Sequence, residues 1–355
     1  MDSFNIDSHK LIYHIARVND WLKGRNIYPI YAEISPSSAC NHRCIFCAFD
    51  YLDYRPRYIK KKCLLSAISG MAECGIKSIM YAGEGEPLLH KDIIELITHT
   101  KNSAIDTALN TNGILLDKNM AEGIIRHLSW LRVSLDAGSP NVYSQIHQCD
   151  KKDFGKAIEN IAGAIKLKKK NKYRCVIGAQ LVFLRHNYKE IAKLTTLLKK
   201  IKIDYLIIKP YSHHLKSKND LAGTNAYSHL YSRLAKELGG LGDSNFKIIF
   251  RPNALQRLSA NKSYKQCLGL PFWTYISSSG DIYACSAFLG DKKFSYGNIY
   301  KEDFRRIWNA KRRTQVLAMF FKRIDIAACR RACRLDAINQ YLWELKHLPE
   351  HINFI

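Results

Sequence analysis

The stretch Cys40-Asn41-His42-Arg43-Cys44-Ile45-Phe46-Cys47 places three thiols at the spacing C-x3-C-x2-C. Thiolate is the ligand that iron–sulfur clusters use, and three protein ligands on a four-iron cluster would leave one iron free to bind a small molecule. A structural zinc site or three unrelated thiols are the alternatives. Zinc sites usually take four ligands, often from two C-x2-C pairs. No fourth cysteine lies nearby here, although His42 could serve as a ligand.

The residues before the cysteines predict where the triplet lies in the fold. Residues 28–34 are typical of a buried strand, and residues 35–38 (Ser-Pro-Ser-Ser) are typical of a turn. The cysteines should therefore lie on a loop at the carboxyl end of a first strand. Parallel α/β folds place their chemistry at this end of the strands.

Strands and helices alternate along the next part of the chain. Apolar segments separated by helical patterns predict six strands, at residues 28–34, 77–82, 107–110, 130–135, 174–183 and 205–208. Six β/α units indicate an α/β barrel or a doubly wound sheet. A complete eight-unit barrel typically needs about 250 residues, so six units fit a partial, open (β/α)6 barrel of the TIM type.

With its cysteine triplet directly after a first strand, the chain resembles the radical S-adenosylmethionine (SAM) enzymes. In that family the open iron binds the amino and carboxylate groups of SAM, and an electron from the cluster cleaves SAM to methionine and a 5′-deoxyadenosyl radical. The radical then abstracts a hydrogen atom from the substrate. The resemblance implies a partial barrel, a SAM-binding [4Fe-4S] cluster and an electron donor of the flavodoxin or ferredoxin type.

Composition narrows the class of protein. The chain has 355 residues, of which 47% are hydrophobic, enough for a full core. It has no apolar run long enough to span a membrane and no signal-peptide layout at its start, so we expect a cytoplasmic protein with reduced thiols. The net charge of +24 suggests an anionic partner, such as a phosphorylated metabolite, a nucleotide, a nucleic acid or a membrane surface. A lysine-rich surface that is merely solvated is the alternative.

Shifts in composition suggest five segments. We expect an amphipathic lead-in helix within residues 1–27, with Leu11, Ile12, Ile15, Val18 and Leu22 at helical spacing. The barrel should occupy residues 28–215, and a linker with a bridging helix residues 216–260. A small domain carrying an auxiliary cluster should cover residues 261–340, followed by a tail at residues 341–355.

The second strand runs into Gly83-Glu84-Gly85-Glu86-Pro87. Glycines at a strand end let a ligand approach the backbone closely, and a carboxylate there can hold an ammonium group, although a tight turn is the simpler explanation. The segment resembles the family's GGEP element, which binds the SAM amino group. The resemblance assigns this contact to Glu86, with Gly85 as backbone support. Glu84 departs from the family pattern, because it occupies the first of two adjacent glycine positions.

Polar residues end the next strands. Asn112 follows the third predicted strand, and Ser134 and Asp136 close the fourth. Such residues are also common turn formers. The resemblance implies that they face the ribose and methionine of SAM. It also implies that Phe46 packs near adenine, that Gln180 on the fifth strand lines the adenine side, and that Arg185 pairs with the SAM carboxylate.

A second group of cysteines lies near the C-terminus. Cys267 and Cys285 flank a predicted hairpin whose turn contains Gly280, and Cys329 and Cys333 follow. A zinc knuckle with these four ligands is the alternative to a cluster. The group resembles the SPASM or "twitch" extension of radical SAM enzymes. Four cysteines without a C-x2-C-x5-C run imply the shorter form, with one auxiliary [4Fe-4S] cluster. A fully ligated cluster can relay an electron but cannot bind substrate, which suits oxidation of a substrate radical, while a redox-neutral reaction stays open.

Three further residues are candidates for catalysis. Lys209 and Tyr211 end the sixth predicted strand, at the open mouth of the barrel. Lys209 could deprotonate a substrate hydroxyl or hold a phosphate, unless it is a solvated loop lysine. Cys149 could donate a hydrogen atom in an epimerase, unless it is an idle thiol.

The combined prediction is a radical SAM enzyme that acts on a polar, anionic small molecule such as a sugar, cyclitol or nucleotide derivative. Its auxiliary cluster would assist an oxidation. The alternative is an enzyme that modifies or epimerises a residue in a peptide. A third hypothesis, a basic nucleic-acid-binding protein with structural metal sites, is disfavoured because no RNA- or DNA-reading signature is present.

Overall fold

The computed structural model describes residues 4–221 and 228–354. Residues 1–3, 222–227 and 355, which fall in the predicted N-terminal segment, linker and tail, lie outside the described part. Within that part, one sheet contains ten strands in the order β10-β9-β8-β1-β2-β3-β4-β5-β6-β7. The strands are β1 (Tyr31–Ile34), β2 (Ser78–Tyr81), β3 (Asp106–Thr111), β4 (Trp130–Ser134), β5 (Val176–Phe183), β6 (Tyr205–Pro210), β7 (Lys247–Phe250), β8 (Trp273–Ile276), β9 (Asp281–Tyr283) and β10 (Ser295–Asn298).

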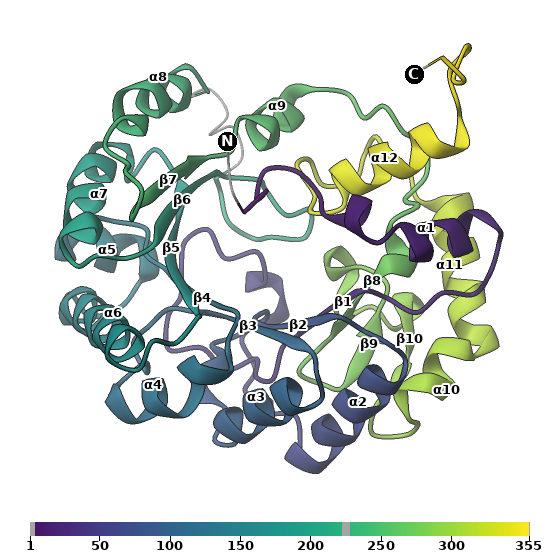
Figure 1. Ribbon diagram of the computed structural model, residues 1–355, viewed down its shortest axis with the longest axis horizontal. Helices are drawn as coiled ribbons and strands as arrows, with labels where there is room; N and C mark the ends of the chain where they lie inside the picture. The colour runs from purple at the N-terminus through teal and green to yellow at the C-terminus, as the bar shows by residue number, and fades with distance from the viewer. Residues whose placement is uncertain (1–3, 222–227, 355) are drawn as a thin grey trace.

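The sheet is an open, curved barrel, as predicted. Each neighbouring pair from β8 through β1 to β7 is parallel, whereas β9 and β10 continue the sheet as antiparallel strands. Figure 1 shows the strands as an arc with helices on its outer side. Because β7 and β10 are the two edges of the sheet, the barrel does not close.

The helices bury one apolar face against the outer side of the sheet. Side chains that alternate along the strands, such as Ile79, Leu109 and Leu131, are fully buried under helix residues such as Ile68 and Leu96. The helices are α1 (Ile15–Leu22), α2 (Lys61–Glu73), α3 (Ile93–Asn102), α4 (Lys118–Ile124), α5 (Pro140–His147), α6 (Lys152–Lys170), α7 (Ile191–Lys200), α8 (Ser228–Gly239), α9 (Pro252–Ser259), α10 (Phe304–Asn309), α11 (Lys311–Arg323) and α12 (Asp336–Lys346). Over the described residues, we find no helix whose length and apolar character would let it cross a membrane.

Two predicted segments differ from the structure. The predicted linker at 216–260 contains not only a helix, α8, but also β7 and α9, and β7 extends the barrel by pairing with β6. At the other boundary, α12 continues six residues past 340, so the helix ends at Lys346 and the predicted tail begins too early. The elements α8, β7 and α9 and the end of α12 are therefore regular parts of the fold.

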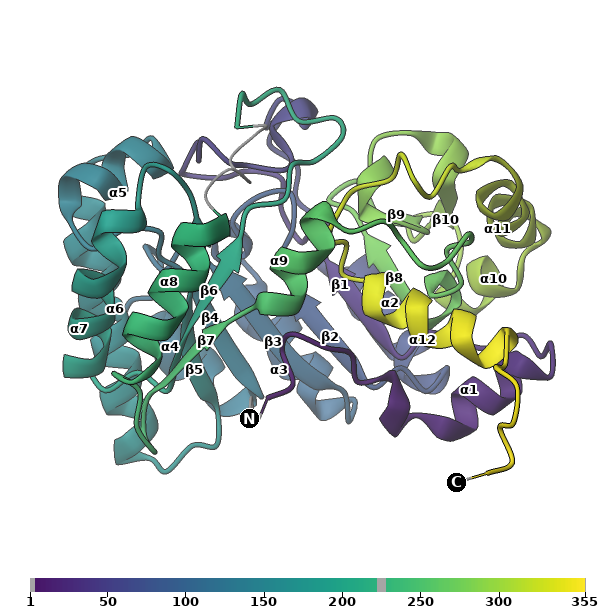
Figure 2. The ribbon, with the colours of Figure 1, turned by 90° about the horizontal axis from the view of Figure 1, so that it is seen from above.

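The N-terminal segment also differs from its prediction. The α-helix covers only Ile15–Leu22, and of the predicted apolar face only Leu11 and Val18 are buried, whereas Ile15 is 73% exposed. Described residues before it, such as Phe4 and Asp7, instead contact elements of the barrel. Phe4 packs against Tyr205 with ring centroids 5.4 Å apart. Figure 2 shows this segment at the end of the barrel opposite the loops that follow β1 and β6.

Candidate functional site

The three cysteines of the first motif lie on the loop that leaves the carboxyl end of β1. Backbone hydrogen bonds fix this loop to α5, because the amides of Arg43 and Ile45 donate to the carbonyls of His147 and Ile146. All three thiols are half-buried. Burial raises the pKa of Cys40 to about 11, and burial with the neighbouring Cys47 raises the pKa of Cys44 well above its usual value. Without a cation the thiols would be protonated, whereas iron stabilises the thiolates.

A second donor set overlaps this loop. His42, Cys44 and His147 each bring one ligand atom within 4.8 Å of the others. That spacing suits a single ion. The ligands of a four-iron cluster lie farther apart, because each binds a different iron, and the three cysteines offer the soft sulfur donors that such a cluster requires. The cysteine triplet therefore fits a cluster, and the two histidines lie beside Cys44 as neighbours of the cluster ligands.

The loop after β2 packs directly on the cysteine loop. Gly85 has no room for a side chain, since a Cβ atom there would lie 2.2 Å from the carbonyl oxygen of Ala39. The carboxylate of Glu86 is buried and accepts hydrogen bonds from Thr111 Oγ1 (2.6 Å), the Asn112 amide (2.8 Å) and the Leu88 amide (3.0 Å). Burial raises the pKa of Glu86. Here Glu86 ties the ends of β2 and β3 together, and its contact with an ammonium group stays a prediction.

Glu84, the residue that departs from the family pattern, has a structural partner. Its carboxylate accepts hydrogen bonds from the amide (2.9 Å) and the hydroxyl (2.7 Å) of Ser278. Ser278 belongs to the turn between β8 and β9, and β9 leads to Cys285. Glu84 therefore connects the loop after β2, which packs on the first cysteine group, to the hairpin that leads to Cys285 of the second group.

Of the predicted residues at the ends of β3 and β4, Asn112 contacts the cysteine loop directly, and Asp136 is linked to it through His147. The side-chain amide of Asn112 donates to Asn41 Oδ1 at 2.7 Å. Ser134 is half-buried at the end of β4. Asp136 is fully buried, accepts a hydrogen bond from the Val182 amide, and lies 3.3 Å from Nε2 of His147. Asn112 and Asp136 thus support the loop from two neighbouring strands.

The other predicted SAM contacts are more dispersed. Phe46 is half-buried and packs with Leu184 and Tyr211 in a small apolar cluster. Gln180 pairs in register with Ser134 on β4, so the two side chains lie side by side across the strands. Arg185 is exposed just beyond the end of β5. These positions border the carboxyl ends of β4 and β5, where the resemblance places adenine and the SAM carboxylate.

Two of the candidate catalytic residues, Tyr211 and Cys149, lie in loops outside the strands. The hydroxyl of Tyr211 donates to Asn219 Oδ1 at 2.8 Å, within the loop that follows β6. Cys149 lies next to His42 and Asp153. Burial and Asp153 raise the pKa of its thiol to about 12. Among the described residues, no contact joins Cys149 to Lys209 or Tyr211.

Lys209 faces the barrel interior, which is the side of the sheet away from the helices. Its neighbours on β6, Ile208 and Pro210, are buried, whereas Lys209 is half-buried. Burial and, to a lesser extent, nearby arginines together lower the pKa of Lys209 to about 7; in order of effect the arginines are Arg330, Arg251, Arg334 and Arg132. The interior therefore gathers cations from β4, β6, β7 and the C-terminal cysteine loop.

The four C-terminal cysteines converge. Burial raises the pKa of Cys267 well above its usual value, and the thiols of Cys285, Cys333 and Cys329 raise it further, which requires that all four lie close together. Three of the sulfurs accept N–H hydrogen bonds: Cys267 from Asn339, Cys285 from the Ala287 amide and Cys333 from the Leu335 amide, at 3.4 to 3.5 Å. Such donors are the environment of cluster thiolates. The set fits a fully ligated cluster.

Lys262 holds the loop that carries two of these cysteines. Its ammonium group donates to the carbonyls of Ile326 (3.0 Å), Cys329 (3.2 Å) and Arg330 (3.2 Å). Three carbonyls on one side chain fix the path of the loop between α11 and α12. This clamp had no sequence signal, because the lysine and the loop are more than sixty residues apart.

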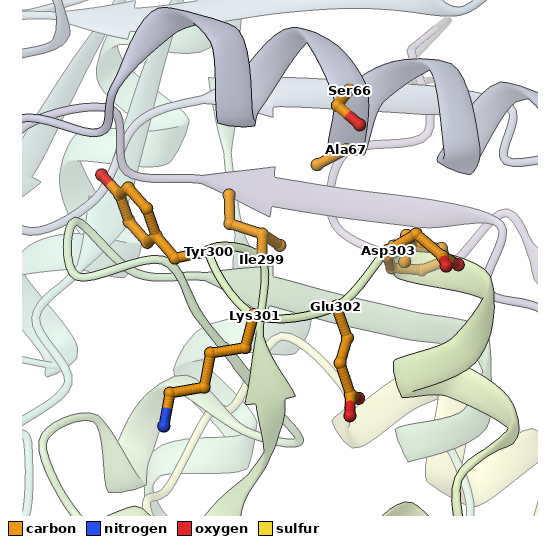
Figure 3. Close-up of a pocket in the computed structure, with 8 residues that line it drawn as sticks. Ser66, Ala67, Ile299, Tyr300, Lys301, Glu302 and Asp303 are labelled. Atoms are coloured by element: carbon orange, nitrogen blue, oxygen red, sulfur yellow. The ribbon is translucent and has the colours of Figure 1, made fainter.

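Several interior residues were not predicted from the sequence. His147, Arg132, Arg330, Arg334 and Glu33 are the main ones. Arg132 had a signal, since a charged residue between the apolar residues of a buried strand must face something other than the helices. By contrast, a crevice of about 180 Å³ on the outer surface, between α2 and the loop after β10, contains none of the predicted site residues (Figure 3).

Comparison with known families supports both cysteine sites. The family model of the Radical SAM superfamily matches residues 34–198, and the SPASM model, an iron-sulfur cluster-binding domain, matches residues 267–334. Cys40, Cys44 and Cys47 lie in the first range, and the four C-terminal cysteines lie in the second. The two matched domains therefore imply the [4Fe-4S] clusters that the sequence predicts, with SAM as the ligand of the first cluster.

Curated relatives match part of the chain. A probable GTP 3′,8-cyclase of Methanocaldococcus jannaschii is 35% identical over 145 residues, 40% of this chain and 47% of that protein. The GTP 3′,8-cyclase of Limosilactobacillus fermentum is 31% identical over 121 residues, 33% of this chain and 36% of that protein. The matched stretch thus spans less than half the length of these relatives.

Solved structures share the fold over most of the chain. Streptococcus suis SuiB bound to S-adenosylmethionine has a TM-score of 0.65 at 20% identity, over 84% of this chain and 70% of SuiB. The enzyme anSMEcpe with bound AdoMet has a TM-score of 0.59 at 20% identity, over 83% of this chain and 84% of that chain. At this identity the likeness establishes the fold.

Proposed function

We propose that this chain, which contains a Radical SAM domain and a SPASM iron–sulfur domain, removes a hydrogen atom from a polar, anionic small molecule held in its barrel interior. An oxidation of the substrate would follow. The assignment of individual residues to SAM, substrate and clusters is part of the proposal.

The observation that carries the proposal is that both cysteine groups border the same interior. Arg330 and Arg334 flank Cys333, and both lower the pKa of Lys209 on β6. Arg334 also forms an ion pair with Glu33 on β1, the strand that leads into the first cysteine loop. A substrate beside Lys209 would therefore lie between the two groups of thiols.

When bound, SAM and the two clusters would supply the radical that takes the hydrogen atom and the acceptor for one electron. The chain would supply the rest. Cys40, Cys44 and Cys47 would hold the first cluster, and the four C-terminal cysteines the second. Lys209, with its pKa near 7, is suited to accept the proton of a substrate hydroxyl when the hydroxyl carbon is oxidised. The loss of one hydrogen atom, one proton and one electron converts an alcohol to a carbonyl.

The interior favours a small polar molecule. Ser134, Gln180 and Lys209 present polar groups on neighbouring strands, and the surrounding arginines favour an anion. The curated relatives are named for action on GTP, a small anion, although the chain spans less than half of their length. An electron donor of the flavodoxin or ferredoxin type belongs to the proposal as well.

A peptide substrate is the second candidate. SuiB has also been solved with its precursor peptide SuiA, and anSMEcpe with a peptide. These structures support the fold and leave the substrate of this chain to experiment.

Anaerobic turnover tests the two candidates together. The reconstituted enzyme would be supplied with SAM, a reductant and fractions of a cell extract separated by size, and 5′-deoxyadenosine would be quantified. We expect stimulation by the small-molecule fraction and none in a variant with Cys40, Cys44 and Cys47 changed to Ala. Stimulation by peptides alone would contradict the small-molecule proposal.

A further inference from the structure

Three side chains with metal-binding atoms meet where the first cysteine loop packs against the turn between α5 and α6. His42, Cys149 and Asp153 each bring one ligand atom within 4.8 Å of the others. His42 comes from the cysteine loop, Cys149 from the turn, and Asp153 from the first turn of α6. Neither proposed cluster uses any of these three side chains, so they form a separate donor set.

The backbone holds His42 against these partners. The amide of the next residue, Arg43, donates to the carbonyl of His147 at 2.9 Å, and His147 is the last residue of α5. The side chain of His42 is 1% exposed, whereas that of Asp153 is 23% exposed. The donor set is therefore anchored in the interior at His42 and open to solvent at Asp153.

Both ring nitrogens of His42 are buried, and neither has a hydrogen-bond partner among the described residues. A neutral imidazole carries one donor and one acceptor, and burial of such groups without partners costs free energy. The neighbouring Asp153 does not remove this cost. Its Oδ2 lies 3.4 Å from Nε2 of His42, which is longer than the roughly 2.7–2.9 Å of a charge-assisted hydrogen bond. A cation bound by both side chains would give each of them a partner.

Cys149 is a better candidate than Cys44 for the sulfur ligand of such a cation. His42 also belongs to a donor set with Cys44 and His147, but Cys44 is one of the three thiols that fit the first cluster. The thiol of Cys149 donates to the carbonyl of Asp150 over 3.6 Å, and a metal ion could replace this weak hydrogen bond. The set with Cys149 therefore leaves the cluster ligands intact.

The types and charges of the three donors favour zinc. Zinc binds thiolate, imidazole and carboxylate at about 2.0–2.3 Å, so the ligand atoms of a tetrahedral site lie roughly 3.3–3.8 Å apart. Shifts of roughly 1 Å would bring atoms that now lie within 4.8 Å of one another to this spacing. A thiolate and a carboxylate would balance the two charges of zinc, so that no net charge is buried. A soft sulfur ligand disfavours magnesium and calcium.

We propose that His42, Cys149 and Asp153 bind one zinc ion, with a water molecule in the fourth position on the exposed side of Asp153. Cys149 binds as the thiolate, and its proton passes to the solvent. The ion fastens the first cysteine loop to the turn between α5 and α6, so its role is structural. This inference goes beyond the proposed function and does not depend on the substrate.

Metal analysis of the anaerobically reconstituted enzyme tests the site. After incubation with one equivalent of zinc chloride and removal of unbound metal, we expect about one zinc per chain and an unchanged iron content. In competition with a chelator, C149S and D153N should each bind zinc at least about 100-fold more weakly, because losing a ligand costs more than losing the partner of a ligand. D150N, at an exposed aspartate of the same turn, and C63S, at a half-buried thiol of α2, are the controls and should match the wild type.

X-ray absorption at the zinc edge distinguishes this site from zinc bound by the cluster cysteines, even if a variant also loses iron. In the wild type we expect one sulfur ligand, with nitrogen and oxygen as the others. Three or four sulfur ligands would assign the zinc to a cluster site and overturn the proposal. Equal zinc affinity in the wild type, C149S and D153N, or no zinc retained by the wild type, would overturn it as well.

Formation of 5′-deoxyadenosine by the same samples separates the zinc site from the proposed function. If the wild type holds both clusters and cleaves SAM without binding zinc, the zinc site fails and the radical function stands. If zinc binds as expected and SAM is not cleaved by a protein that holds both clusters, the proposed function fails and the zinc site stands.

Discussion

Nδ1 of His147, at the end of α5, lies 3.1 Å from Sγ of Cys44. The same imidazole has Nε2 3.3 Å from a carboxylate oxygen of Asp136, and its ring lies 4.2 Å from the ring of Tyr143. Both side chains of the His147–Asp136 pair are 1% exposed. The thiol of Cys44, which we propose as a ligand of the first cluster, is therefore connected through one histidine to the end of β4.

The H147F variant should weaken the first cluster. Partners of metal ligands orient those ligands, and their loss typically costs about 10-fold to 100-fold in metal affinity or activity. Hydrogen bonds to cluster sulfurs also raise the reduction potential. In the variant molecules that still bind the first cluster, its potential should therefore fall. Iron content and a redox titration followed by electron paramagnetic resonance would measure both. H186F, at an exposed histidine, is the control. Equal iron content and potential in H147F and wild type would contradict a role for His147.

The G85A variant should displace the cysteine loop. The new Cβ would meet the carbonyl oxygen of Ala39, the residue before Cys40, at 2.2 Å, and backbone cannot yield as a flexible side chain can. We expect a loss of about 1–3 kcal/mol of stability and poor iron loading of the first site. The matched control is G155A on α6, where a Cβ meets nothing within 4 Å. If the two alanine variants load iron equally, Gly85 does not support the loop.

The E84A variant should destabilise the junction between the barrel and the C-terminal hairpin. It leaves the amide and hydroxyl of Ser278 without their acceptor, and such losses cost about 1–3 kcal/mol. Denaturant unfolding would measure the change. E302A, at an exposed glutamate of the outer crevice, should stay within about 0.5 kcal/mol of the wild type. A stability of E84A equal to that of E302A would show that the junction does not depend on Glu84.

The K209M variant should gain stability in a pH-dependent way. The pKa of Lys209 falls from 10.5 to about 7 on folding, chiefly through burial, so protonation disfavours the folded state. This cost is absent above pH 10.5, grows as the pH falls toward 7, and is complete below 7. Without an added anion, K209M should therefore melt at a higher temperature than the wild type at pH 7, and the difference should vanish toward pH 10. A difference that does not change with pH would refute this assignment.

Much of the barrel could be predicted because its strands are local and strongly apolar. All six predicted strands are present, since each is bounded by turn residues and followed by an amphipathic helix. The strand β7 was missed because it begins with Lys247, is followed by Arg251, and pairs with a neighbour on one side only. Most of the predicted apolar face of the N-terminal helix is exposed. Helical spacing of apolar residues does not reveal whether another element packs against that face.

The candidate site could be predicted only where a motif is local. The cysteines and the residues after the strands are visible as motifs, whereas Cys44 and His147 are separated by 103 positions. The ion pair of Glu33 with Arg334 joins residues 301 positions apart. Such pairs depend on the topology that brings β1, α5 and the C-terminal loop together. Glu84 shows the converse, since its departure from the family motif is explained by a distant serine.

The account rests most directly on two separate iron–sulfur sites, and iron and sulfide counts per chain test it. After anaerobic reconstitution we expect about eight irons in the wild type, as two four-iron clusters. A variant with Cys40, Cys44 and Cys47 changed to Ala should hold about four, as should a variant with Cys267, Cys285, Cys329 and Cys333 changed to Ala. Four irons in the wild type with none in the first variant would remove the auxiliary cluster from the mechanism. Zinc without iron at both sites would contradict the radical function itself.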